Sequence, residues 1–468
     1  MTHDIFARFR ASLGTDPLDA LHDGLIGRDA VIDGPFGPRR MIYADYIASG
    51  RALRQVEEFV MTEVLPWYAN SHTEASHCGG TMTRMRRAAR AEILRCTGGD
   101  AETHAAIFTG SGATAGINRL VHLWAVGPDT TVILGPYEHH SNILPWRESG
   151  AHIIDLPEAA CGGPCPDALA DALSVKGPKV VALSACSNIT GITCDVAELT
   201  KLAKLSGARV LWDYAGGAPY LPIDMALGMD AVVASPHKFV GGPGASGVLI
   251  LRRDSVQSQV PSLPGGGTVR FVSPHGHDYA TGVEAREEAG TPNVVGDIRA
   301  ALVFALKDAV GQSTLDARHA AWWAKAQGRL RDHDRIELLG NRDCPRVPIL
   351  SFRLRDGRGG HIHQQLATRM LSDLYGIQAR GGCACAGPYV HSLLGMDRAE
   401  SDRLRHAILS GVEIEKPGFV RLNLCWLAPE AEIDAILNAL DDLSHRAPDL
   451  VANYGCDTSR AIFSPLAA

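Results

Sequence analysis

Seven short apolar segments lie between residues 105 and 252, and their alternation with turns and helical stretches constrains the fold more than any other feature. Strands that alternate with helices form βαβ units, and segments that are apolar throughout are typical of strands buried on both faces. We therefore expect an α/β fold with a mostly parallel seven-stranded sheet flanked by helices. The expected strands are Ala106–Thr109, Val132–Gly135, His152–Leu156, Val180–Ser184, Arg209–Trp212, Ala231–Ala234 and Val248–Leu251.

The 468 residues are enough for two domains. We expect a large domain over residues 41–310, a smaller α+β domain over residues 311–468, and an N-terminal segment, residues 1–40, that packs on the smaller domain. The elements expected in the smaller domain are strands near Ile349–Leu354 and Gly418–Leu424 and helices over Gln364–Leu374 and Ala431–Leu443.

Two connecting segments differ in composition. Pro261–Pro274 is rich in glycine and proline and is expected to be a loop, whereas Gly296–Leu330 is expected to be a long helical stretch leading out of the large domain. The pattern of strands and helices that predicts the two domains does not explain residues 1–40 and 395–416.

Composition and charge narrow the class of protein. The net charge of −7 is mild, which argues against nucleic acid or an anionic membrane as the main partner. No apolar run approaches the roughly eighteen residues of a membrane span, and the first residues do not resemble a secretory signal. Eleven cysteines scattered through a large chain fit a reducing compartment better than a disulfide framework, so we expect a cytoplasmic protein.

A lysine, Lys238, follows the expected strand Ala231–Ala234 after two hydrogen-bonding residues, Ser235 and His237. Open α/β sheets bind ligands at the carboxyl ends of their strands. Desolvation there favours the neutral amine, which is a nucleophile towards carbonyl groups. A solvated loop lysine is the alternative, and this residue alone does not decide between them.

Three other segments carry residues suited to a flat, anionic cofactor. The small residues of Thr109–Gly116 open a helix, where they form either a phosphate cradle or a plain tight turn. Asp213 ends a strand and either caps the next turn or keeps a ring nitrogen protonated. His139 follows another strand and can stack on a ring. Its neighbour His140 also suggests a metal, but no further ligand stands at zinc spacing, so no metal is expected. Together with Lys238, these residues predict a pyridoxal 5′-phosphate (PLP) site.

The same segments resemble the class V aminotransferase family of PLP fold type I, nearest the cysteine desulfurases and selenocysteine lyases. The resemblance covers roughly residues 41 to 440. The matching segments are Tyr43–Asp45, Gly112–Asn118, Glu138–Asn142 with Pro145 and Trp146, Ser187–Gly191, Asp213–Ala215, Ser235–Lys238 and Glu288–Asn293.

The resemblance assigns roles at the cofactor. It implies that Lys238 forms the internal aldimine and acts as catalytic acid and base, that Asp213 pairs with the pyridine nitrogen, and that His139 stacks on the ring as a catalytic residue. It implies a homodimer, because Thr291 in this family reaches the phosphate of the partner subunit's cofactor. The other implied cofactor-binding residues are Ala113, Thr114, Asn188, Ser235 and His237.

The resemblance also assigns substrate residues. Arg421 matches the arginine that binds the α-carboxylate of the amino acid, for which the guanidinium fork is suited, and Arg380 and Asn188 are expected beside it. An ordinary surface ion pair is the alternative for Arg421. Cys385 falls on the sulfur-accepting position, where an arginine and glycine amides favour a nucleophilic thiolate. A metal half-site formed with Cys383, or cysteines that merely pack, are the alternatives.

Two positions depart from the desulfurase pattern. Gly216 stands where desulfurases have a glutamine that donates to the cofactor's phenolate oxygen, so reaction specificity does not simply follow from the resemblance. Cys383 and Ala384 stand where two histidines are common, a Cys-x-Cys form nearer to the molybdenum cofactor sulfurase branch.

These features predict a dimeric PLP enzyme that removes sulfur or selenium from L-cysteine or a related amino acid through Lys238 and a persulfide on Cys385. The expected partners are the amino-acid substrate and a sulfur-acceptor protein. The alternatives are a β-lyase or aminotransferase acting without a persulfide, a kynureninase-like lyase, and a PLP-binding protein without catalysis.

Overall fold

The structure is a computed structural model that describes residues 5–71 and 73–466. The chain divides into two compact units. The larger unit comprises the described residues up to Ile26, Ser49–Cys186 and Cys194–Thr314; the smaller comprises Gly27–Ala48, Ser187–Thr193 and the residues from Leu315 onward. The sequence predicts that residues 1–40 pack as one segment on the smaller domain. In the structure, the described residues up to Ile26 belong to the larger unit, and the chain enters the smaller unit at Gly27.

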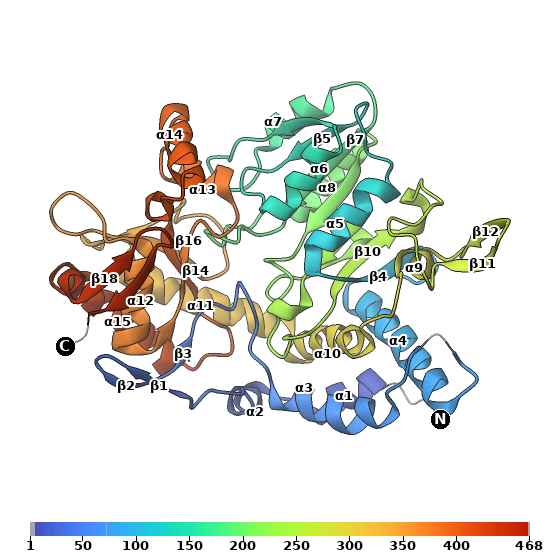
Figure 1. Ribbon diagram of the computed structural model, residues 1–468, viewed down its shortest axis with the longest axis horizontal. Coiled ribbons are helices and arrows are strands. Elements are labelled where there is room, and N and C mark those ends of the chain that lie inside the picture. Colours follow the sequence, from blue (N-terminus) through green and yellow to red (C-terminus); the bar gives the residue numbers. More distant parts are fainter. Residues whose placement is uncertain (1–4, 72, 467–468) are drawn as a thin grey trace. The chain divides into compact units, whose positions relative to one another are not determined.

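The larger unit contains a seven-stranded sheet with the strand order β4-β10-β9-β8-β7-β5-β6 (Figure 1). Only β10 runs antiparallel to its two neighbours, so the expected mostly parallel α/β sheet is confirmed. The strands are β4 (His104–Gly110), β5 (Thr131–Leu134), β6 (His152–Asp155), β7 (Lys179–Ser184), β8 (Arg209–Asp213), β9 (Ala231–Ala234) and β10 (Gly247–Arg252).

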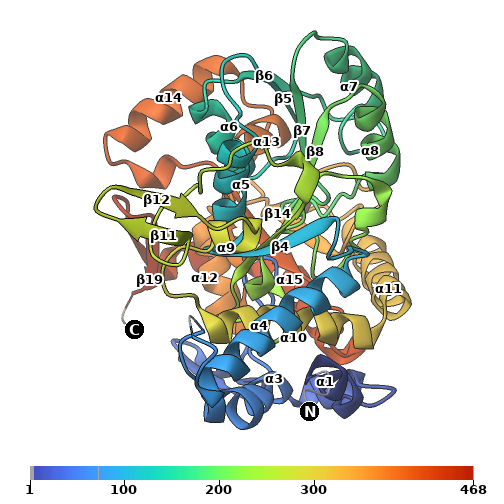
Figure 2. The ribbon, with the colours of Figure 1, turned by 90° about the vertical axis from the view of Figure 1, so that its right-hand side faces the viewer.

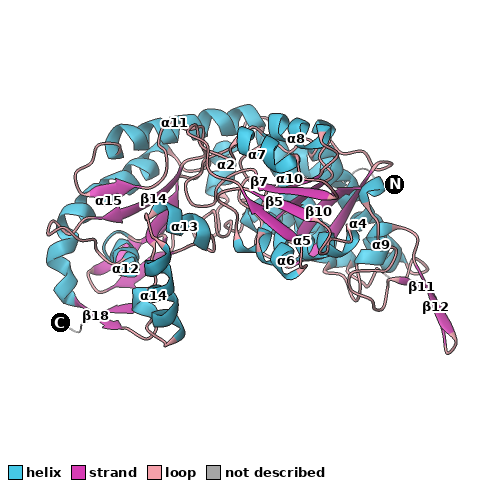
Figure 3. Ribbon diagram, turned by 90° about the horizontal axis from the view of Figure 1, so that it is seen from above, coloured by secondary structure: helices cyan, strands magenta, loops and turns pink. Residues whose placement is uncertain are grey.

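Helices cover both faces of this sheet. Figure 3 shows α5 and α6 on one face and α7, α8 and α10 on the other. Since both faces are covered, inner strands such as β5 and β9 are buried along their whole length, which explains their continuous apolar sequences, whereas the edge strand β6 is partly exposed. The helices are α5 (Gly112–Leu123), α6 (Leu144–Glu148), α7 (Pro166–Leu173), α8 (Val196–Leu205) and α10 (Val294–Val310).

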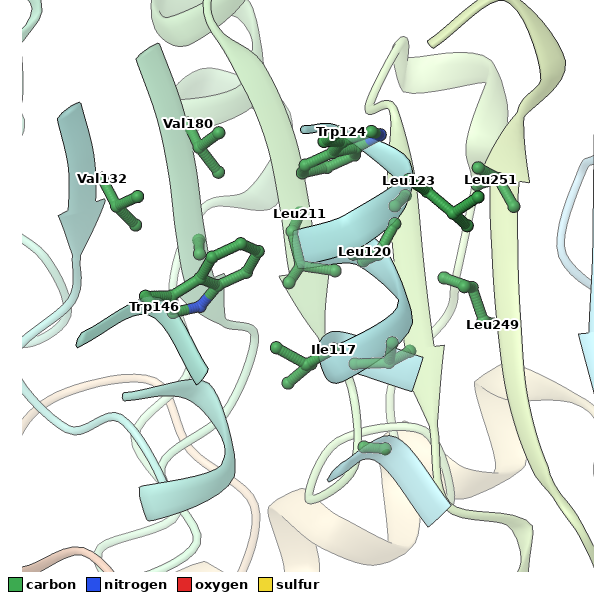
Figure 4. Close-up of a cluster of buried hydrophobic side chains, with 14 of the residues drawn as sticks. Ile117, Leu120, Leu123, Trp124, Val132, Trp146, Val180, Leu211, Leu249 and Leu251 are labelled. Atoms are coloured by element: carbon green, nitrogen blue, oxygen red, sulfur yellow. The ribbon is translucent and has the colours of Figure 1, made fainter. Parts of the chain in front are cut away.

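The apolar side of α5 forms the core on its face of the sheet (Figure 4). Ile117, Leu120 and Leu123 follow helical spacing, so their side chains point to one side, where they pack with Leu211 and Leu249 from the strands. All five are fully buried, and burying one such side chain stabilises the fold by about 1.5–3 kcal/mol. This packing fixes the position of the N-terminus of α5 above the sheet.

The expected long helix Gly296–Leu330 is two helices. α10 ends at Val310 and α11 (Gln312–Leu330) follows, because Gly311 adopts a positive φ of 85°, which an α-helix does not continue through. α10 is buried along most of its length. It packs beside α4 (His77–Cys96) in both Figure 1 and Figure 2.

The prediction that Pro261–Pro274 forms a loop is partly wrong. β11 (Val269–Ser273) and β12 (Gly276–Tyr279) form an antiparallel hairpin that stands out from the larger unit in Figure 3. Phe271 and Val272 are strand-forming residues, but their side chains are exposed, so no alternating burial pattern marks this strand.

The N-terminal residues of the larger unit form helices beside α4 and α10. Phe6 and Phe9 of α1 (Ile5–Ser12) are completely buried, and the ring of Phe9 lies 5.1 Å from that of Phe59. This apolar contact accounts for the assignment of α1 to the larger unit. The remaining helices of this unit are α2 (Leu18–Asp23), α3 (Arg54–Phe59), which continues as a π-turn and a 3-10 turn to Trp67, and α9 (Val283–Glu287).

The smaller unit is built on an antiparallel sheet with the order β13-β14-β17-β16. The expected strands and helices are confirmed, and residues 395–416 contain a further helix, α14. The strands are β13 (Ile336–Leu338), β14 (Ile349–Leu354), β16 (Arg380–Gly382) and β17 (Phe419–Asn423), with the pairs β1 (Val31–Gly34) and β2 (Gly37–Arg40), β3 (Ile42–Tyr43) and β15 (Ile377–Gln378), and β18 (Tyr454–Asp457) and β19 (Ile462–Pro465). The helices, beside α11, are α12 (Gln364–Tyr375), α13 (Gly387–Leu393), α14 (Arg398–Leu409) and α15 (Glu430–Leu450).

None of the helices formed by the described residues is both long and apolar enough to cross a lipid bilayer.

Candidate active site

Most of the expected cofactor residues lie in the larger unit, at the edge of the sheet where its parallel strands end. We call this group the lysine cluster. Its members follow β4, β5, β8 and β9, whose carboxyl ends share one edge, and this is why segments distant in sequence meet there. The lysine cluster comprises Ala113, Thr114, His139, Asp213, Ser235, His237 and Lys238.

The N-terminus of α5 is pressed against the segment that carries Lys238. The Ala113 amide donates to the Ser235 hydroxyl at 3.0 Å, and a Cβ on Gly112 would lie 3.0 Å from that hydroxyl and 3.5 Å from the His237 ring. Ser111 provides no side-chain cap for this helix. The first-turn amides and the helix dipole therefore form a cradle suited to an anion.

A short chain of hydrogen bonds joins this cradle to His139. The Thr114 hydroxyl lies 2.6 Å from the Ser141 hydroxyl, which lies 3.1 Å from Nδ1 of His139. The Ser141 amide also donates to Nδ1 at 3.1 Å. Because Nδ1 accepts this bond, the proton of the neutral ring is on Nε2. The structure thus fixes both the ring orientation and the tautomer of His139.

Asp213 is a buried carboxyl group at the end of β8. Its Oδ1 accepts the Ala215 amide at 2.7 Å, and burial raises its pKa, although the Ala215 hydrogen bond and the nearby Lys238 charge oppose this rise. No hydrogen bond to Oδ2 is found within the described residues. A buried carboxylate with an oxygen to spare is suited to a cationic partner. Gly216, the departure from the desulfurase pattern, is buried in the turn that follows.

The segment Pro236–Lys238 is a single 3-10 turn, and hydrogen bonds to the segment around Gly50 and Arg51 hold it in place. The Gly50 amide donates to the His237 carbonyl at 2.9 Å, and the Gly241 amide donates to the Arg51 carbonyl at 2.8 Å. Burial, and then the charge of Lys238, lowers the pKa of His237, which favours the neutral imidazole. The backbone around Lys238 is therefore fixed on both sides.

Glu138 is a buried residue behind His139 to which the sequence assigned no role. Its carboxylate accepts the amide and hydroxyl of Ser184 at 2.8 and 2.6 Å and the side-chain amide of Asn142 at 2.6 Å. Burial raises the pKa of Glu138 to about 7 despite these hydrogen bonds, and the charge of Asp213 adds to the rise. Gly135, which has no Cβ, makes room, since a Cβ there would lie 2.5 Å from the Glu138 carboxylate.

Thr291 lies apart from these contacts, on an exposed loop before α10. The loop begins at Glu288, a largely buried residue that accepts hydrogen bonds from Arg86 at 2.6 Å, from Arg90, and from the Phe108 amide at 2.8 Å. Glu288 thereby anchors the loop to α4 and β4.

The remaining expected residues lie in the smaller unit, and we call them, together with Asp45, the arginine cluster. Arg421 is only 3% exposed. Its Nη2 donates to Asp45 Oδ1 at 3.1 Å and its Nη1 to the Asn188 carbonyl at 3.0 Å. Arg380 donates through Nε to the other oxygen of Asp45 at 3.0 Å. In the sequence, Asp45 is marked only as part of the segment Tyr43–Asp45. Its contacts could not be predicted, because they involve two arginines that are distant in the chain.

Cys385 lies exposed at the tip of a turn in the same unit. Ala384 and Cys385 have positive φ values of 48° and 57°, and the Ala386 amide donates to the Cys383 carbonyl at 3.2 Å. Two successive positive φ values are the pattern of a mirror-image turn, which costs energy for residues other than glycine. The Asn188 side chain stabilises this turn by donating to the Ala384 carbonyl at 2.8 Å.

One group of side chains has the composition of a metal site. His333, Asp441 and His445 have ligand atoms within 4.8 Å of one another, in the smaller unit. Nδ1 of His333 accepts the amides of Arg335 and Ile336, and its Nε2 lies 3.1 Å from Asp441. Since Nδ1 is an acceptor, Nε2 carries the proton, and a metal would have to displace it. These hydrogen bonds explain why the three side chains lie together.

Comparison with known proteins identifies relatives along most of the chain. The sequence profile of the aminotransferase class-V family matches residues 42–436. A probable cysteine desulfurase of Vibrio cholerae is 27% identical over 379 residues, 79% of this chain and 90% of the relative. Cysteine desulfurase CsdA of Escherichia coli is 29% identical over 340 residues, 70% of this chain and 76% of the relative. The solved cysteine desulfurase of Thermococcus onnurineus matches the fold with a TM-score of 0.71 at 23% identity, covering 86% of this chain and 95% of that one.

Proposed function

This chain belongs to the aminotransferase class-V family, and on that basis we propose that it is a PLP-dependent cysteine desulfurase. It removes sulfur from L-cysteine, or selenium from its selenium analogue, and leaves alanine. The observation that carries this choice within the family is the exposed thiol of Cys385, presented on a strained turn. The curated relatives at 27–29% identity named as cysteine desulfurases support the same reaction.

The residues present fit the cofactor of this family, pyridoxal 5′-phosphate. The anion cradle at α5 suits its phosphate, and the buried Asp213 carboxylate, with Oδ2 to spare, suits a protonated ring nitrogen. The backbone contact between Gly112 and Gly247 brings the cradle close to the sheet. When bound, PLP supplies an aldehyde that reacts with amines and a ring that withdraws electrons from the substrate's Cα.

The protein's own residues then have separate tasks. The Nζ of Lys238 would hold the cofactor and would act as the base and acid that moves the proton at the substrate's Cα. Asp213 would stabilise a protonated ring nitrogen, and the oriented ring of His139 would stack on the cofactor. Arg421 binds the substrate's α-carboxylate, with Arg380 and Asn188 supporting it.

Cys385 receives the sulfur. Its thiolate attacks the substrate's sulfur, a new S–S bond forms, and the bond between sulfur and Cβ breaks with its electron pair going to carbon. The products are a persulfide on Cys385 and, after protonation of the carbon fragment, alanine. A thiol compound or a sulfur-acceptor protein then removes the persulfide sulfur. The eleven free cysteines suit a reducing cytoplasm, where we place the enzyme.

The test uses holoenzyme and L-cysteine, with alanine, sulfide and pyruvate measured with and without a reductant. Wild type is expected to give one alanine per sulfur and a persulfide on Cys385 detectable by mass spectrometry. Cys385→Ala should abolish both persulfide and sulfur transfer, whereas the matched variant Cys383→Ala should retain them. Sulfur transfer that continues in Cys385→Ala would overturn the role of Cys385, and pyruvate with ammonia would establish a β-lyase instead.

The active form in this proposal is a homodimer in which Thr291 reaches the partner's cofactor phosphate. The exposed position of Thr291 and the protruding β11–β12 hairpin with Phe271 and Val272 support an interface here. Mixing inactive Lys238→Ala with weakened Thr291→Val subunits is expected to raise activity above that of Thr291→Val alone, since the mixed dimer keeps one site with an intact lysine and an intact partner threonine. No increase on subunit exchange would contradict this arrangement.

A further inference from the structure

We propose that Asp45 is the positioning residue of the substrate carboxylate site, holding Arg421 and Arg380 together so that Arg421 selects substrates with an α-carboxylate. The inference rests on the proposed function, which assigns the substrate's carboxylate to Arg421. It concerns a residue that would not itself touch the substrate.

The two arginines are direct neighbours in the sheet. β16 and β17 pair antiparallel with Arg380 opposite Arg421. Like charges placed directly opposite one another on a sheet repel. One of the two, Arg421, is nearly completely buried, where water does not screen the repulsion. A counter-ion is therefore needed for both guanidinium groups to lie on the same side.

Asp45 provides this counter-ion with one oxygen for each arginine. Oδ1 accepts from Arg421 at 3.1 Å and Oδ2 accepts from Arg380 at 3.0 Å, and Asp45 is itself only 9% exposed. The three side chains sum to one positive charge, which matches the single negative charge of an amino-acid carboxylate. Replacing Asp45 with a neutral residue would leave two repelling cations.

The backbone before Asp45 is fixed to β17 and to β15, and the backbone after it is fixed to β17. The Asn423 amide donates to the Ala44 carbonyl at 2.8 Å, and the Ala44 amide donates to the Gln378 carbonyl at 2.9 Å. On the other side, the Ile47 amide donates to Oδ1 of Asn423 at 3.2 Å. Asp45 is thus attached to the strand that carries Arg421, and its carboxylate sets the direction of that guanidinium.

The orientation of Arg421 also bears on the cysteine turn. Its Nη1 donates to the Asn188 carbonyl, and the Asn188 side chain donates to the carbonyl of Ala384, beside Cys385. Asp45, Arg421 and Asn188 therefore form one line of hydrogen bonds from the carboxylate site to the sulfur-accepting turn.

The experiment compares two amines that differ in the carboxylate. L-Cysteine and cysteamine, which lacks the carboxylate, are titrated against holoenzyme while the absorption of the bound cofactor and the turnover are followed. Asp45→Asn is expected to raise the half-saturating concentration of L-cysteine by roughly tenfold to hundredfold, as when supporting hydrogen bonds are removed, and that of cysteamine less than about twofold. Asp45→Glu, which keeps the charge, should recover part of the loss.

Glu337→Gln is the matched control, because Glu337 also joins two basic groups of the smaller unit, Arg353 and His361, each at 2.9 Å. It should change neither titration. Equal losses for both amines, or the same change in Glu337→Gln, would overturn the role of Asp45. Binding of L-alanine, which has the carboxylate but no sulfur, tests the role of Asp45 independently of the proposed reaction. If Asp45→Asn weakens its binding while wild type releases no sulfur from cysteine, the proposed reaction fails but the role of Asp45 stands.

Discussion

Gly112 and Gly247 approach one another more closely than any other residue type would allow. A Cβ on Gly247 would lie 2.5 Å from the Cα of Gly112 and 2.6 Å from its amide nitrogen, both backbone atoms that cannot turn aside. Gly112 itself has a positive φ of 63° at the first residue of α5. The contact joins the N-terminus of α5 to the antiparallel strand β10, and so sets the distance between the anion cradle and the sheet.

Gly247→Ala is therefore expected to damage both stability and cofactor binding. Inserting a methyl group into packed backbone typically costs about 1–3 kcal/mol, and the displacement would fall on the amides that hold the phosphate. Thermal unfolding and equilibrium titration with PLP measure the two effects. Gly127→Ala is the control, since nothing lies within 4 Å of its added Cβ. Equal PLP affinity in the two variants would contradict the importance of this contact.

Asp213→Asn is expected to retain the cofactor but to lose turnover. The amide keeps the size of the side chain but removes the negative charge that stabilises a protonated ring nitrogen. Loss of a preorganised electrostatic partner typically costs about 10²–10³-fold in rate. Turnover of L-cysteine and the absorption of the bound cofactor measure this. Asp230→Asn is the control, because buried Asp230 pairs with Lys204 before β9 begins and should affect stability alone.

Glu138→Gln is expected to change how stability depends on pH. Burial raises the pKa of Glu138 to about 7 from an ordinary 4.5, so the folded protein holds this proton more tightly than the unfolded chain. The stability that the proton contributes is fully present below pH 4.5 and is lost as the pH rises through 7. The amide does not titrate. From pH 5 to 8 the free energy of unfolding should therefore shift in favour of the variant, by up to about 3 kcal/mol at 1.4 kcal/mol per pH unit.

Denaturant unfolding of the holoenzyme at several pH values measures this shift. The exposed Glu148 on α6 offers the control, and Glu148→Gln should follow the wild-type pH dependence. Parallel curves for wild type and Glu138→Gln would show that Glu138 does not titrate in this window.

The sheet and the lysine cluster could be predicted from the sequence because local patterns mark them. Strands such as Ala231–Ala234 are apolar throughout, and Asp213 ends one strand while Lys238 follows another by a single turn, so a parallel sheet brings them to one edge. The hairpin β11–β12 escaped prediction because its apolar residues are exposed. The break at Gly311 depends on one positive φ within a continuous helical pattern.

The supporting residues could not be predicted, because their roles arise from contacts between distant segments. Asp45 and Arg421 are 376 residues apart in the sequence. Glu138, which follows β5, accepts a hydrogen bond from Ser184 at the end of the neighbouring strand β7. A single acidic residue in a motif is compatible with a surface position as well as with a buried ion pair. Only the register of β16 and β17, which places Arg380 opposite Arg421, shows why an acidic residue is needed there.

Glu288→Gln is expected to destabilise the larger unit and loosen the loop that carries Thr291. The carboxylate is the shared acceptor for Arg86 and Arg90, both largely buried, and together with Asp297, which pairs with Arg86 at 2.8 Å, it balances their charge. Removing one member of a buried ion pair typically costs about 3–5 kcal/mol, because it leaves an uncompensated charge. Glu74→Gln is the matched control: Glu74 pairs with Arg87 of the same helix at 2.6 Å, but both side chains are more than half exposed, so the loss should stay below about 1 kcal/mol. Thermal and denaturant unfolding compare the variants. If Glu288→Gln unfolds at the same denaturant concentration as Glu74→Gln, the Glu288 network does not anchor this loop.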